Sequence, residues 1–73
     1  MNNELLTVKE TSEYLKTNLA YVYKLLDAGL LEFLILGRKK IRKVTLENFL
    51  SKWEGWDLTD PFNPVKIESA VKW

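Results

Sequence analysis

The 73-residue chain contains no cysteine and no histidine. Without cysteine it can form neither a disulfide framework nor a thiolate metal site. Without histidine it lacks the usual acid–base group at neutral pH and the commonest metal ligand. It also has no glycine-rich phosphate loop and no metal-binding spacing. We therefore predict a protein that is not an enzyme, with no catalytic residue, no metal and no cofactor.

Long apolar runs are absent as well. The longest apolar cluster, residues 30–36, is interrupted by Glu32 and is far too short to span a bilayer. The N-terminus, Met1-Asn2-Asn3-Glu4, is not cationic and precedes no long apolar stretch, so it predicts no signal peptide. A small domain without disulfides fits a reducing compartment. We expect no contact with a membrane and a cytoplasmic location.

The chain does have enough apolar side chains for one folded domain, and its charge is unevenly distributed. Hydrophobic residues make up 47% of it, which argues against disorder. Residues 1–46 carry eight Lys/Arg and five Asp/Glu, a net charge of +3, whereas residues 47–73 carry three and five, a net charge of −2. A local positive field of this kind attracts polyanions, although the overall charge is only +1.

Two short helices are predicted near the N-terminus. Thr7 and Glu10 have the spacing of a capping box, which starts a helix that we expect to run to about Lys16. Asn18 is a favourable N-cap for a second helix over residues 19–28. Because only two residues separate them, the helices should meet at a steep angle through a tight turn. The expected buried positions are Val8, Thr11, Ser12 and Leu15 in the first helix and Val22, Leu25 and Leu26 in the second.

A basic hairpin should follow, after a left-handed stop at Gly29. The apolar run Phe33–Leu36 leads into Gly37, and five of the seven residues 37–43 are cationic. On the return strand Ile41 alternates with cations, so it should face the core while Lys40 and Arg42 face outward. A charge run is usually a solvated face, but at a turn it projects from the body and can grip a phosphate backbone.

A third helix is expected after a cap at Thr45, with Leu46, Phe49, Leu50 and Trp53 at helical spacing. The predicted fold is small and mainly α with a β-hairpin: a winged helix-turn-helix of three helices and a two-stranded wing. We assign residues 1–53 to this DNA-binding domain and residues 54–73 to an aromatic and acidic tail. In the tail, residues 65–68 alternate like a strand, but Ile67 and Val71 could equally share a helix face.

In a helix-turn-helix the second helix enters the major groove of DNA, so its exposed face carries candidate contacts. That face is poor in side chains for bidentate base contacts, which predicts modest sequence discrimination. Tyr21 could also be a half-exposed packing residue, and Asn18 is available to DNA only if capping leaves it free. The predicted contacts to double-stranded DNA are Thr17, Asn18, Tyr21 and Lys24 in the helix and Arg38, Lys39, Lys40, Arg42 and Lys43 in the hairpin.

Residues 5–50 resemble the excisionase-type, MerR-like helix-turn-helix family. The resemblance rests on the order of short motifs and is clearest in the glycine followed by basic residues. These motifs are Leu5-Leu6-Thr7-Val8-Lys9-Glu10, Glu13-Tyr14-Leu15, Val22-Tyr23-Lys24-Leu25-Leu26, Ala28-Gly29, Leu36-Gly37-Arg38-Lys39 and Leu46-Glu47-Asn48-Phe49-Leu50.

The resemblance implies a bacterial or phage protein whose wing lies along the minor groove or its phosphates. It implies one of two roles. The first is a recombination directionality factor that bends DNA, with further copies of itself, and helps a tyrosine integrase excise a mobile element. The second is a small transcriptional regulator. The chain departs from the family at Leu19, Ala20 and Tyr21, where an Arg and a Ser or Thr are common. Its return strand is also one residue short of the common pattern.

The tail suggests an additional surface. A strand that is apolar on both faces, as residues 33–36 are, should be covered on both sides. The tail could fold back over it, or the strand could meet a partner such as another copy or an integrase. A third function, from a different class, is a protein-interaction adaptor that does not bind DNA. The residues expected to pack or to contact a partner are Trp53, Trp56, Phe62 and Trp73.

Overall fold

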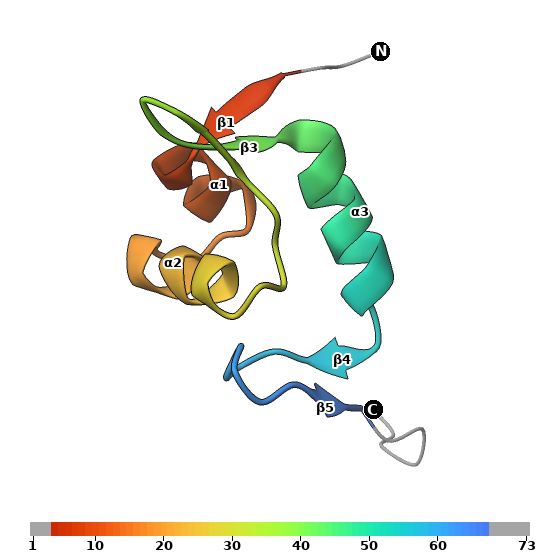
Figure 1. Cartoon of the computed structure of the whole chain (residues 1–73). Helices are drawn as coiled ribbons and strands as arrows, with labels where there is room; N and C mark the ends of the chain where they lie inside the picture. The colour runs from red at the N-terminus through yellow and green to blue at the C-terminus, as the bar shows by residue number, and fades with distance from the viewer. Residues whose placement is uncertain (1–3, 68–73) are drawn as a thin grey trace.

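The computed structural model describes residues 4–67, and these form a winged helix-turn-helix. Figure 1 shows α1 and α2 stacked beside α3, with the β2–β3 hairpin projecting at the upper left and the tail below the helices. The expected three helices and hairpin wing are therefore confirmed. In chain order the elements are β1 (Leu5–Thr7), α1 (Val8–Tyr14), α2 (Leu19–Asp27), β2 (Leu34–Leu36), β3 (Arg38–Arg42), α3 (Lys43–Trp53), β4 (Trp56–Asp57) and β5 (Val65–Lys66).

Thr7 ends β1 and caps α1. Its side-chain oxygen accepts a hydrogen bond from the Glu10 backbone N–H at 3.0 Å, and the Glu10 carboxylate accepts one from the Thr7 N–H at 2.9 Å. This is the capping box that the spacing predicts, and it satisfies two N–H groups that the first turn leaves without helical partners. The Thr11 hydroxyl donates to the Thr7 carbonyl at 2.9 Å, which allows this polar side chain to be buried.

The first helix ends at Tyr14, two residues earlier than expected, because Lys16 adopts a left-handed conformation with φ 57°. The Lys16 N–H donates to the Glu13 carbonyl at 3.1 Å, and the Thr17 N–H donates to the Ser12 carbonyl at 2.8 Å. These two bonds make a Schellman motif, the usual way to close a helix. The helix-turn-helix angle thus depends on a lysine in a conformation that glycine normally supplies.

The second helix begins and ends at nearly the predicted positions. The Asn18 side-chain oxygen accepts from the Tyr21 N–H at 2.9 Å, which caps the N-terminus. Gly29 has φ 78°, and the bonds from Gly29 to the Leu26 carbonyl and from Leu30 to the Leu25 carbonyl form a second Schellman motif. The predicted glycine stop is confirmed, with the last helical residue at Asp27.

The wing belongs to a sheet of three antiparallel strands in the order β1-β3-β2. The sequence did not predict β1, which pairs only with residues 40–42 of β3. Strand β2 pairs with residues 38–40, so the outer end of the hairpin is two-stranded and β2 forms an edge. Ile41 lies opposite Leu6 and is fully buried, which confirms the expected inward orientation of Ile41.

The third helix does not begin at Thr45, so the predicted cap there is wrong. The helix starts at Lys43 directly from β3, and its N-cap position is Arg42, whose side chain makes no capping bond. The Lys43 N–H instead donates to the Glu4 carbonyl at 2.9 Å. Pairing of β3 with β1 therefore brings Glu4 to the start of α3, a long-range contact that no local pattern signals.

The core lies where β3, α2 and α3 meet, and it extends to β1 and the start of α1. Residues from all these elements share one buried cluster. Helical periodicity predicted its members in the three helices, but not Leu6 in β1 or Leu31 in the loop after α2. Leu50 is an exception, because it is exposed rather than part of the α3 stripe. The buried apolar residues are Leu6, Val8, Val22, Leu25, Leu26, Leu31, Ile41, Leu46 and Phe49.

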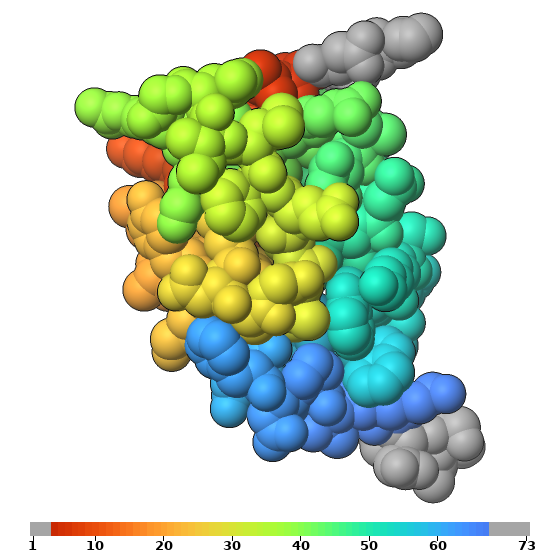
Figure 2. Space-filling model, in the orientation of Figure 1, coloured from red at the N-terminus to blue at the C-terminus, as the bar shows by residue number. Residues whose placement is uncertain are grey.

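The described part of the tail packs below the helices and leaves the wing uncovered. Leu58 is half-buried against the core, and Pro61 is fully buried. Val65 and Lys66 form a strand that pairs with β4, so the strand rather than the helix is the correct alternative at these two residues. Val71 lies outside the described residues. Figure 2 shows the tail and the hairpin at opposite ends of the molecule. The prediction that the tail covers residues 33–36 is therefore wrong for residues 54–67.

Candidate nucleic-acid interface

A groove of about 520 Å³ separates the wing from the beginning of α1 and α2. One wall of this groove comes from β3, whose hairpin projects from one side of the molecule (Figure 1). In a winged helix-turn-helix this is the side on which the second helix and the wing can reach the same duplex. The lining residues are Thr7, Val8 and Lys9 from the β1–α1 junction, Leu19 and Tyr23 from α2, and Arg38, Lys39 and Lys40 from β3.

The groove is positively charged. Four of its eight lining residues are cations, and none is Asp or Glu. Lys9 comes from the β1–α1 junction and the other three cations from β3, so the positive charge comes from two parts of the chain rather than from the hairpin alone. A concave surface lined by charge of one sign concentrates its field and attracts polyanions.

The cations of β3 divide between the two faces of the sheet. Successive side chains of a strand point to opposite faces, and Ile41 faces the core. Arg38, Lys40 and Arg42 therefore share the outer face, whereas Lys39 shares the inner face with Ile41. The outer face carries a row of three cations along the central strand of the sheet.

Lys39 has a more specific environment than the other wing cations. Its ammonium nitrogen lies 5.3 Å from the ring centroid of Tyr23 in α2 and 5.2 Å from that of Phe33. Each such cation–π contact contributes about 0.5–1 kcal/mol at a partly exposed site. Lys39 thus fixes the wing against α2 and holds positive charge in the groove between them.

The helix residues proposed to contact DNA have different surroundings. Lys24 is exposed, whereas Thr17 is half-buried. The Asn18 side-chain oxygen is used for capping, so only its NH₂ group remains to donate to a nucleic acid. None of these three side chains lines the groove beside the wing.

Tyr21 differs most from the expectation that it faces DNA. It is half-buried, and its hydroxyl donates a hydrogen bond to the backbone carbonyl of Leu58 in the tail. Burial, and secondarily the negative charge of Asp57, raise the pKa of Tyr21 above its ordinary value. The structure assigns this side chain to packing between α2 and the tail, which is the alternative that the sequence left open.

Lys43 lies at the start of α3, where its ammonium nitrogen is 5.7 Å from the ring centroid of Tyr14. It is therefore not one of the groove cations. Sequence reasoning missed Lys9, Leu19 and Tyr23, which line the groove instead. Leu19 and Tyr23 are four residues apart and share one flank of α2, but only the long-range position of the wing shows that this flank matters.

Three of the aromatic residues expected to pack or to contact a partner, Trp53, Trp56 and Phe62, lie in the described part of the chain. Trp53 packs against the core and meets Trp56 edge to face, with ring centroids 5.3 Å apart. The Nε1 atom of Trp53 is buried without a hydrogen-bond partner among the described residues. Phe62 is 59% exposed. Trp73 lies outside the described residues.

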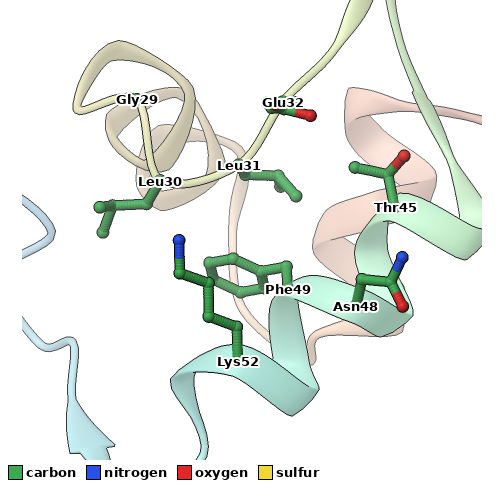
Figure 3. A pocket seen from close by; sticks show the side chains of 8 residues that line it. All are labelled: Gly29, Leu30, Leu31, Glu32, Thr45, Asn48, Phe49 and Lys52. Atoms are coloured by element: carbon green, nitrogen blue, oxygen red, sulfur yellow. The ribbon is translucent and has the colours of Figure 1, made fainter.

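A smaller hollow of about 260 Å³ lies between α3 and the loop that follows α2 (Figure 3). Leu31 and Phe49 line it together with Glu32 and Lys52, which lie at its opposite ends. Because its walls carry one charge of each sign, this hollow offers no net attraction for a polyanion. The groove beside the wing is therefore the better candidate for a nucleic acid.

Across residues 4–67, no helix has both the length and the apolar character needed to cross a membrane. The same residues contain no group of three or more His, Cys, Asp or Glu side chains placed to bind a metal.

Comparison with known protein families agrees with the geometry. No curated protein and no solved structure matches the chain significantly. The helix-turn-helix domain family matches residues 5–53, from β1 to the end of α3. This match includes every element that borders the groove and covers well over half of the chain. The chain therefore belongs to the helix-turn-helix domain family, a family of small DNA-binding domains.

Proposed function

We propose that this protein binds double-stranded DNA through α2 and the wing and acts as an excisionase-type recombination directionality factor. The observation that supports the binding mode is the groove between α2 and β3, whose charged residues are all cations. The excisionase role is supported by the resemblance of residues 5–50 to that family. Under this proposal residues 1–53 bind DNA, and residues 54–73 pack on the domain or contact a partner.

Each part of the site has a separate role in this mechanism. Arg38, Lys40 and Arg42 contact phosphates, because they form the cationic row on the outer face of the wing, where Arg38 and Arg42 are exposed and Lys40 is half-buried. Lys39 holds the wing against α2, and Lys24 contacts DNA from the exposed side of that helix. Copies bound side by side would bend the DNA and present it to a tyrosine integrase.

A salt titration tests the DNA contacts. The variant Arg38→Ala/Lys40→Ala removes two groove cations, and Lys52→Ala/Lys66→Ala removes two exposed cations remote from the groove. The slope of log K against log salt should become shallower by about 0.9 for each phosphate that the variant no longer neutralises. The groove variant should show this change, and the control should keep the slope of the unmodified protein.

The outcomes separate the alternatives. An unchanged slope in the groove variant would remove the wing from the binding mechanism. No DNA binding by the unmodified protein, even at low salt, would contradict the whole proposal and favour the adaptor function. The excisionase role predicts a tyrosine integrase gene at the same locus and stimulation of its excision reaction by this protein. Tight binding without any stimulation would indicate a transcriptional regulator.

A further inference from the structure

Strand β2 carries three apolar side chains into solvent on both of its faces. Leu34, Ile35 and Leu36 are 42%, 68% and 56% exposed. The strand is an edge of the sheet, and residues 54–67 of the tail do not cover it. Natural proteins protect edge strands with charges, proline or a covering element, and β2 itself has none of these.

The sheet register places each of these apolar side chains beside a cation. Leu36 pairs with Arg38 and Leu34 with Lys40, while Ile35 pairs with Lys39. Side chains of residues paired across antiparallel strands lie on the same face, about 5 Å apart. An occupant of this surface must therefore offer apolar area with anionic groups close beside it.

The minor groove of DNA has this combination, with sugars and base edges between two rows of phosphates. Proteins that kink DNA insert apolar side chains such as Leu and Ile between base steps from that groove. The outer end of the hairpin is two-stranded and turns at Gly37, so it is narrow. It also adjoins the cationic groove through Arg38 and Lys40.

Resting on the DNA binding proposed above, we propose that Ile35 and Leu36 form an apolar wedge. The wedge enters the minor groove beside the wing cations and partly unstacks a base step. The cations hold the phosphates on either side, and the apolar pair supplies the kink. Phosphate contacts and bending are then separable, because they depend on different side chains of one hairpin.

The test uses the variant Ile35→Ser/Leu36→Ser, which removes the wedge and keeps every charge. Its control is Val65→Ser/Ile67→Ser, which removes apolar side chains of the tail that are 54% and 47% exposed. The probe is a mixed-sequence DNA duplex of about 21 base pairs, two helical turns, with a donor and an acceptor fluorophore at its ends. Energy transfer reports bending, and the same titration in salt reports phosphate contacts.

The wedge variant should bind with several-fold lower affinity and an unchanged salt slope, and the increase in energy transfer on binding should disappear. The control should bend DNA as the unmodified protein does. Ile35→Val/Leu36→Met keeps the apolar character and should bend DNA as the unmodified protein does. The unchanged salt slope of the serine variant shows that its failure to bend DNA does not reflect misfolding.

Equal bending by the serine variant and the unmodified protein would overturn the wedge while leaving the DNA-binding proposal intact. If the unmodified protein failed to bind the duplex, the DNA-binding proposal itself would fail. Dimerisation without DNA that the serine variant abolishes would instead assign β2 to contact with a second copy, and would also overturn the wedge.

Discussion

The Tyr21 hydroxyl in α2 donates a hydrogen bond to the backbone carbonyl of Leu58, 37 residues later in the chain. Leu58 is half-buried against the core at the same place. With 100° per residue, Tyr21 lies on the flank of α2 opposite Leu19 and Tyr23, which face the wing. The second helix is thus held by the wing on one side and by the tail on the other.

Replacing Tyr21 by Phe should lower the free energy of unfolding by about 1 kcal/mol, because the hydrogen bond to Leu58 is removed. For a domain of this size that corresponds to a fall in Tm of roughly 4–8 °C. DNA affinity should change little, since Tyr21 does not line the groove. Tyr23→Phe is the matched control and should keep its Tm. Equal Tm values for the two variants would contradict the role assigned to the Tyr21 hydroxyl.

Loss of the Tyr21 proton should also lower the free energy of unfolding at alkaline pH. Burial, then Asp57, raise the pKa of Tyr21 above the ordinary value of 10.0, so the unfolded chain releases this proton at lower pH than the folded one. The contribution to stability is complete below pH 10 and disappears as the pH rises through the folded pKa. Denaturation followed from about pH 8 to about pH 11 should therefore show a steeper decline for the unmodified protein than for Tyr21→Phe. Parallel curves would exclude this linkage.

The two Schellman motifs predict opposite effects on stability when the residue in the left-handed conformation is replaced. Lys16→Gly relieves strain, because glycine has no Cβ to oppose a positive φ. Glycine also increases the entropy of the unfolded chain, so the net rise in the free energy of unfolding should be about 0.5–1 kcal/mol. Gly29→Ala should lower it by about 1 kcal/mol through strain alone, since an added Cβ would meet no atom within 4 Å. Urea denaturation measures both changes, and a destabilising Lys16→Gly would show that the lysine side chain has another role.

Thr7 and Thr45 provide a test of helix capping. Thr7→Ala removes the capping box of α1 and should cost about 1 kcal/mol. Thr45 lies inside α3 and makes no cap, so Thr45→Ala should change stability by less than about 0.5 kcal/mol. Thermal melts of both variants measure the difference. Comparable decreases in Tm would mean that α3 depends on Thr45 as its local sequence suggests.

The sequence predicted the features that depend on neighbouring residues. The capping box at Thr7, the cap at Asn18 and the stop at Gly29 are each made by residues within a few positions of one another. The inward orientation of Ile41 followed from alternation along one strand. These signals also indicated the winged helix-turn-helix, because short helices and a hairpin in this order leave few ways to share one core.

Contacts between distant residues account for what the sequence missed. Strand β1 is only three residues long and is defined by its pairing with β3. The same pairing carries β3 directly into α3 and makes a cap at Thr45 unnecessary. Tyr21 has the sequence position of a DNA contact, but its hydroxyl binds Leu58, and Tyr23 matters through its contact with Lys39. In each case the partner lies too far along the chain for periodicity to signal.

The exposure of β2 also bears on how such a protein can change over evolutionary time. Leu34, Ile35 and Leu36 lie outside the buried cluster, so replacing them need not disturb how the rest of the domain packs. Mutations in β2 should lower the free energy of unfolding much less than mutations of the buried residues Ile41 or Val22. Descendants of this chain can therefore alter the proposed wedge, and with it the bending of DNA, while inheriting an unaltered scaffold.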